Sequence, residues 1–127
     1  MDAVRQEVRQ MLDEYFKAVE RRDLNGSLSC FAKGDDLTVF ENADMYDWDG
    51  FVTFVEGFFQ QVTEIAIALE QCVVNPVAET VAVATGIFRV TGRTTSGEGL
   101  AIRHGYTFVL LKRVDRWLIK HVHESMV

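Results

Sequence analysis

Hydrophobic residues in the first half of the chain recur every three or four positions, which is the spacing of one face of an α-helix. This pattern predicts an amphipathic helix over residues 3–21 and another from about residue 50 to 62. Between them, Asp23 is placed to cap a short helix that runs through Ala32 and ends at Gly34. The apolar positions of the two longer helices are Val4, Val8, Met11, Leu12, Tyr15 and Val19, then Phe51, Phe54, Val55, Phe58, Phe59 and Val62.

The second half of the chain is rich in Val, Thr, Ile and Ala and often alternates apolar with polar residues, as β-strands do. Short turns separate these segments, so consecutive strands should pair antiparallel. Pro76 is expected to mark a break or a bulge, and Val114-Asp115-Arg116 a tight hairpin connection. The predicted strands span residues 37–41, 65–74, 77–93, 100–112 and 117–125.

Helices followed by strands predict a single α+β domain over residues 1–127. Its three helices lie in the N-terminal half of the chain and should pack on one face of a strongly curved antiparallel sheet. Because three helices cannot fill the mouth of such a sheet, a cone-shaped pocket is expected between them.

Composition narrows the classes of partner. The net charge is −6 and no run of Lys or Arg occurs, so neither nucleic acid nor an anionic membrane is an expected partner. No transmembrane segment or signal peptide is apparent, which favours a cytoplasmic location with Cys30 and Cys72 as free thiols.

Three stretches of sequence carry a family resemblance. They are residues 12–19 with 23–26, residues 36–40 with Asp49-Gly50-Phe51, and the terminal residues 107–110 with Trp117-x-Ile119-x-His121-x-His123-x-Ser125. In this order and spacing they resemble the NTF2-like superfamily, and most closely its SnoaL-like, ketosteroid-isomerase-related branch. The resemblance covers nearly the whole chain and implies the cone-shaped fold. It does not imply one activity, since this fold hosts enzymes, binding modules and assembly domains.

The resemblance also implies functional positions. In the isomerase relatives, a tyrosine at the place of Tyr15 donates to a developing enolate, and the catalytic base falls near Glu41. Those relatives add a protonated acid where Thr107 stands here, and threonine cannot play that role. The competing interpretations are that Tyr15 is a core residue with a satisfied hydroxyl group and that Glu41 is an exposed carboxylate at a strand end.

Histidines on the last strand are further candidates. His121 and His123 should share one strand face with Trp117 and Ile119, and therefore point into the cone as a general base or a polar contact. A two-residue turn before this strand brings His104 and Tyr106 to the same face, whereas a three-residue turn brings Arg103 and Thr107. We favour the tight turn. A buried histidine that only fixes the core is the competing interpretation.

Other groups add little chemistry. Three histidines and Glu41 could bind zinc, but this spacing does not require a metal, and neither a metal nor a cofactor is expected. Trp48 lies in a loop that could rim the cone and close over an apolar ligand, or simply hold the loop in place. No phosphate-binding loop occurs.

The sequence thus predicts a domain that binds a small apolar molecule carrying one polar group. If it is an enzyme, the expected chemistry is proton transfer next to a carbonyl, as in isomerisation, cyclisation or dehydration, with Glu41 or a histidine such as His123 as the base and Tyr15 or Tyr106 as the donor. The alternative is a non-catalytic dimerisation or association domain. Strands that are apolar on both faces predict a homodimer through the open face of the sheet.

Overall fold

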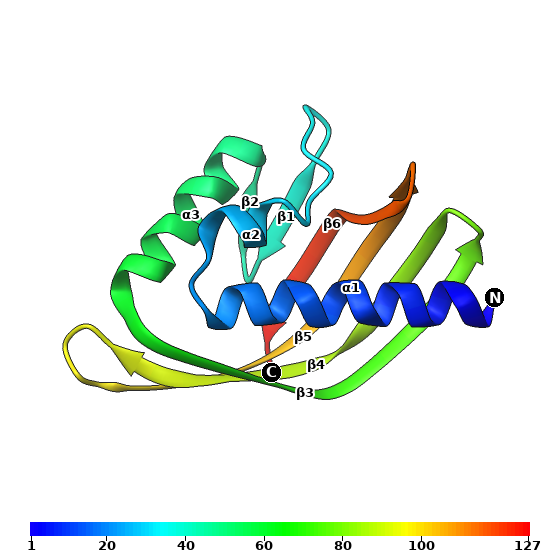
Figure 1. Ribbon diagram of the computed structural model, residues 1–127. Coiled ribbons are helices and arrows are strands. Elements are labelled where there is room, and N and C mark those ends of the chain that lie inside the picture. Colours follow the sequence, from blue (N-terminus) through cyan, green and yellow to red (C-terminus); the bar gives the residue numbers. More distant parts are fainter.

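The computed structural model describes all 127 residues, which form three helices and six strands (Figure 1). The helices are α1 (Asp2–Glu20), α2 (Leu24–Leu28) and α3 (Trp48–Gln61). The strands are β1 (Thr38–Glu41), β2 (Asp44–Tyr46), β3 (Val62–Ala78), β4 (Val81–Thr94), β5 (Gly99–Arg113) and β6 (Arg116–Met126).

The helices begin where the sequence provides caps. The carboxylates of Asp23 and Asp47 each accept a hydrogen bond of 2.9 Å from the backbone N–H three residues later, at the first turns of α2 and α3. Helix α2 is shorter than predicted and ends at Leu28, because the chain beyond it forms a parallel bridge between Phe31 and Ile119. No helix is long and apolar enough to cross a bilayer.

The strands form one sheet in the order β2-β1-β6-β5-β4-β3, and β3 to β6 pair antiparallel as predicted. Strand β1 pairs parallel with β6. Strand β2 was not predicted, because residues 42–49 are polar and read as a turn; it forms a hairpin with β1 through Asn42, whose φ is +56°. Strand β3 continues past Pro76 with a register shift beside it, which an edge strand tolerates.

The helices cover one face of the bent sheet, and α1 lies across it (Figure 1). The core between α1 and the sheet includes Leu12 from the helix and Phe108, Leu110 and Ile119 from the central strands, all at most 1% exposed. Complete burial of such side chains is worth roughly 2 kcal/mol each, which holds α1 against the sheet. The third helix lies beyond the C-terminal end of α1 (Figure 1), and its Phe51 belongs to the same core.

An irregularity in β6 decides which side chains face the helices. Leu110 pairs with Ile119, but the neighbouring Val109 pairs with His121, so Lys120 has no partner in β5. This bulge shifts the alternation by one residue. Trp117 and Ile119 are buried on the helix side, and beyond the bulge this side continues with Val122 and Glu124 rather than with His121 and His123.

Candidate functional site

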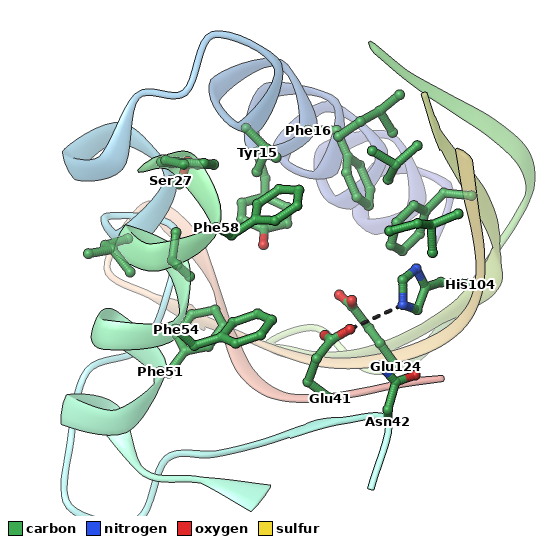
Figure 2. A pocket seen from close by; sticks show the side chains of 18 of the residues that line it. Tyr15, Phe16, Ser27, Glu41, Asn42, Phe51, Phe54, Phe58, His104 and Glu124 are labelled. Atoms are coloured by element: carbon green, nitrogen blue, oxygen red, sulfur yellow. Dashed lines mark ion pairs between the residues drawn. The ribbon is translucent and has the colours of Figure 1, made fainter. Parts of the chain in front are cut away.

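A cavity of about 270 Å³ lies between α1, α3 and the sheet (Figure 2). Of its 20 lining residues 15 are hydrophobic. Seven of these are phenylalanines, namely Phe16, Phe31, Phe51, Phe54, Phe58, Phe59 and Phe88. The five polar or charged lining residues are Ser27, Glu41, Asn42, His104 and Glu124. An apolar cavity with a few polar groups is typical of small-molecule sites.

Three titratable side chains meet at one end of this cavity. One carboxylate oxygen from each of Glu41 and Glu124 and one ring nitrogen of His104 all lie within 4.8 Å of one another. They come from three adjacent strands, because β1 pairs with β6 and β6 with β5. In the β1–β6 register Glu41 and Glu124 are direct partners, so both side chains leave the same face of the sheet. Figure 2 shows the two carboxyl groups directed toward each other.

His104 contacts Glu41 closely. Its Nε2 lies 3.1 Å from Oε1 of Glu41, and the two side chains are only 8% and 11% exposed. The contact is not aligned as a hydrogen bond, and neither ring nitrogen of His104 has a hydrogen-bond partner. The ring is stacked on Phe88, with centroids 5.3 Å apart and planes at 23°. The imidazole is therefore held firmly while its hydrogen-bonding capacity stays unused.

Glu124 is the most perturbed carboxyl group of the site. It borders the cavity and its side chain is partly buried. Burial raises the pKa of Glu124 well above its usual range, and the negative charge of Glu41 and a hydrogen bond with the Glu41 carboxyl group add to the effect. Two carboxyl groups this close titrate as a pair, and burial favours the protonated form of Glu124.

Tyr15 completes the polar end from the opposite side. Its hydroxyl group points from α1 toward Glu124 and Glu41 (Figure 2). Burial raises the pKa of this hydroxyl well above its usual range, and the charges of Glu124, Cys30 and Glu41 act in the same direction. Its ring packs on Phe16 and Phe31, with centroids 5.2 and 5.5 Å away. Tyr15 is thus a fixed, protonated hydroxyl group at the same end of the cavity.

The structure brings three of the sequence-predicted site residues, Tyr15, Glu41 and His104, to this cavity. Glu41 is not the exposed strand-end carboxylate of the competing interpretation, since its side chain is 11% exposed. Tyr106 faces inward but lies behind the lining, where its hydroxyl donates to the backbone oxygen of Gln71 at 3.2 Å.

The expectation that His121 and His123 point into the cone is wrong. Because of the bulge at Lys120, both lie on the other face of the sheet. His121 Nδ1 is 2.9 Å from the backbone oxygen of Thr38, and the ring of His123 packs on Phe40, with centroids 5.4 Å apart. The tight turn itself is confirmed, since Arg113 pairs with Arg116 across two residues and His104 is buried.

Arg103 and Trp48 do not line the cavity either. Arg103 lies on the outer face and pairs with Glu70 at 2.9 Å. Trp48 begins α3 and packs on Phe31, with the Lys33 ammonium 5.8 Å from its ring centroid. It therefore holds the loop in place, the second of the two interpretations of this residue.

Sequence reasoning missed Glu124, which strict alternation placed with Leu118 and Val122 on the face away from the cone. The only sequence signal was indirect. Glu124 is the carboxylate nearest the end of the last strand, so it could lie beside Glu41 if the first and last strands paired. The parallel pairing of β1 with β6, which brings the two together, has no signal in the sequence of either strand.

Comparison with solved structures supports the fold. A provisionally assigned scytalone dehydratase from Novosphingobium aromaticivorans superposes with a TM-score of 0.89 at 14% identity, covering 98% of this chain and 85% of that one. An NTF2-like superfamily protein from Salmonella enterica gives 0.85 at 18% identity, with 98% and 92% covered. A provisionally assigned calcium/calmodulin-dependent protein kinase II association domain from Xanthomonas campestris gives 0.82 at 19% identity, with 95% and 86% covered.

These identities establish likeness of fold and not of activity. None of the curated proteins compared with the chain is significantly similar to it. The family model of the SnoaL-like domain matches residues 8–127, nearly the whole chain. The fold is like that of NTF2-like proteins, and the protein belongs to the SnoaL-like domain family.

Proposed function

We propose that this protein binds a small, mostly apolar molecule in the cavity and transfers a proton next to a carbonyl group of that molecule. Isomerisation, cyclisation and dehydration all begin with this step. The observation that carries the proposal is the meeting of Glu41, Glu124, His104 and Tyr15 at one end of an otherwise apolar cavity. Perturbed titratable groups in such a cavity are typical of catalytic sites.

Each group has a separate role. Glu41 is the base that takes a proton from the carbon next to the carbonyl, and the electron pair moves onto the carbonyl oxygen. The protonated Glu124 and the Tyr15 hydroxyl donate hydrogen bonds to that oxygen as its negative charge develops. Glu41 then returns the proton to carbon or to a leaving group. His104 holds the Glu41 carboxylate through their 3.1 Å contact.

Glu124 supplies the acid that the sequence lacked at Thr107. Position 107 pairs with His123 on the outer face, far from this chemistry. A carboxyl group from the neighbouring strand can donate from the same end of the cavity, so the oxyanion site does not depend on residue 107. The provisional name of the Novosphingobium neighbour, a dehydratase, agrees with proton-transfer chemistry on this fold.

The test needs no knowledge of the natural substrate. In D₂O, the protein should accelerate exchange of the α-hydrogens of cyclohexanone, measured by proton NMR. Glu41→Gln should lower this rate by about 100-fold or more, because general-base catalysis contributes 10²–10⁴. Glu98→Gln, at an exposed turn outside the cavity, is the matched control and should keep the wild-type rate. Exchange no faster than in buffer would remove the catalytic proposal.

A second candidate is an association domain that forms a homodimer through the open face of the sheet. Val73 and Val77 are 60% and 61% exposed, which is unusual for strand valines of a monomer. The Xanthomonas neighbour carries the name of an association domain, and a Chlamydomonas hub homology domain superposes with a TM-score of 0.77. We propose a second copy of this chain as the partner. Such a dimer is compatible with a working cavity on the opposite face.

A further inference from the structure

We infer that the polar end of the cavity is a binding site for small lipophilic primary ammonium ions, which would displace a carbonyl ligand. The inference rests on the proposed function only in requiring that the cavity admits small molecules. It concerns the class of ligand that the cluster of Glu41, Glu124 and His104 selects, whatever reaction takes place there.

The charges at this end of the cavity favour a cation. Two carboxyl groups line it, and no Lys or Arg is among the lining residues. The cations of the neighbouring strands are engaged elsewhere, Arg103 with Glu70 and Lys112 with Glu7, both at 2.9 Å. A carboxylate ligand would add a negative charge to a poorly solvated site, whereas an ammonium group compensates the charges already there.

An ammonium group fits the cluster only once one contact opens. Acceptors about 2.8 Å from one tetrahedral nitrogen stand about 4.6 Å apart, whereas ligands about 2.1 Å from a tetrahedral zinc stand about 3.4 Å apart. The three atoms of the cluster lie within 4.8 Å of one another, but Glu41 Oε1 and His104 Nε2 are 3.1 Å apart. This pair must therefore separate by about 1.5 Å to admit an ammonium group, and a Zn²⁺ titration tests the competing use of the closed spacing.

His104 and the aromatic walls supply further contacts. The imidazole is more than nine-tenths buried and neither nitrogen has a hydrogen-bond partner, so in the tautomer protonated at Nδ1 its Nε2 accepts an N–H of the ligand once the ammonium group has separated it from Glu41. Seven phenylalanines surround the apolar body of the ligand, and rings within about 6 Å of a cation attract it. A cavity of 270 Å³ admits more than benzene, which fits in about 150 Å³.

Binding should also release a proton. Burial and the nearby charge of Glu41 raise the pKa of Glu124 while no cation is present. An ammonium group beside it favours the carboxylate, so Glu124 loses its proton as the amine binds. Proton release distinguishes this mode from simple burial of the apolar body.

The test compares three ligands of one shape: cyclohexylmethylamine, cyclohexylmethanol and cyclohexanecarboxylate. Calorimetry at pH 7 should give at least tenfold tighter binding for the amine than for the alcohol, and no measurable binding of the carboxylate. In buffers of different ionisation enthalpy, the amine titration should show release of up to one proton. Glu124→Gln and Glu41→Gln should each abolish the advantage of the amine, while Glu98→Gln keeps it.

The outcomes separate the two proposals. If the alcohol binds as tightly as the amine, the ammonium site is wrong and the cavity proposal stands. If none of the three binds and cyclohexanone exchange is also absent, the cavity proposal fails as well. If Zn²⁺ binds in the same calorimeter, depends on Glu41 and Glu124, and the amine does not bind, the cluster is a metal site and the ammonium inference is overturned.

Discussion

Glu41 and Glu124 are register partners in the parallel pairing of β1 with β6, and their carboxyl groups face each other at one end of an apolar cavity. A short strand of four residues thereby places a second acid beside the first. Glu41 and Glu124 are far apart in the chain, and only this pairing brings the two buried carboxyl groups together so that they titrate as a pair.

This pairing predicts how stability depends on pH. The raised pKa of Glu124 means that the folded state binds its proton more tightly than the unfolded state, where the ordinary value is 4.5. Stability from this group is fully present below pH 4.5 and is lost as the pH rises toward the folded pKa, by at most about 1.4 kcal/mol per pH unit. Urea denaturation from pH 4.5 to 8 should therefore show the wild type losing stability relative to Glu124→Gln.

Glu70 gives a control of opposite sign. The Arg103 hydrogen bond lowers the pKa of this exposed carboxyl group, and the charges of Arg103 and Arg89 add to the effect. Its contribution is present above its ordinary value of 4.5 and is lost as the pH falls. The free energy of unfolding of Glu70→Gln should therefore be lower than that of the wild type at neutral pH, and the two values should converge as the pH falls.

A pH profile of stability for Glu124→Gln that runs parallel to that of the wild type would contradict a raised pKa of Glu124 in the folded protein.

The hairpin between β5 and β6 contains a strained residue. Val114 has a φ of +57°, a conformation that a β-branched side chain rarely adopts, and it is 95% exposed, so nothing packs against it. Asparagine tolerates this conformation. Val114→Asn should raise the free energy of unfolding by about 0.5–1 kcal/mol, measured by chemical denaturation. Val77→Asn, an exposed valine within β3, should give no such gain.

The sequence predicted the fold well where periodicity is long and regular. The faces of α1 and α3, the four long strands and the two-residue connection at Val114-Asp115 follow from apolar spacing and turn length. It also identified three residues of the cavity. The helix periodicity indicated Tyr15, the family resemblance indicated Glu41, and the tight turn indicated His104.

The remainder depended on features with no local signal. One unpaired residue, Lys120, reverses the orientation of every side chain after it, and no glycine or proline marks the position. His121 and His123 therefore moved to the outer face and Glu124 to the cavity. Similarly, β2 is only three residues long, which is too short for a periodic pattern in its own sequence, and it is a strand because it pairs with β1.

The proposed dimer predicts the mass in solution. One chain is 14.4 kDa, and light scattering at micromolar concentration should give twice this value. Val73→Lys places a charge on the outer face of β3 and should raise the dissociation constant at least tenfold, because the ammonium must be desolvated in the interface. Met45→Lys, equally exposed but on β2 at the far edge of the sheet, should not. A monomeric wild type would contradict the association proposal.

Cavity size should set which ketones the protein accepts. Phe58 lies on α3 and lines the cavity, so Phe58→Ala enlarges it on the side away from Glu41 and Glu124 (Figure 2). The measurement is the ratio of the α-hydrogen exchange rate of a bicyclic ketone, 2-decalone, to that of cyclohexanone in D₂O. This ratio should be at least tenfold higher for the variant than for the wild type. It should also lose about 2 kcal/mol of stability, since Phe58 is only half-buried. Phe40→Ala removes a ring that packs on His123 outside the cavity, and should lower stability without changing the preference. Equal shifts of preference in both variants would mean that general loosening, rather than cavity volume, controls access to the polar end.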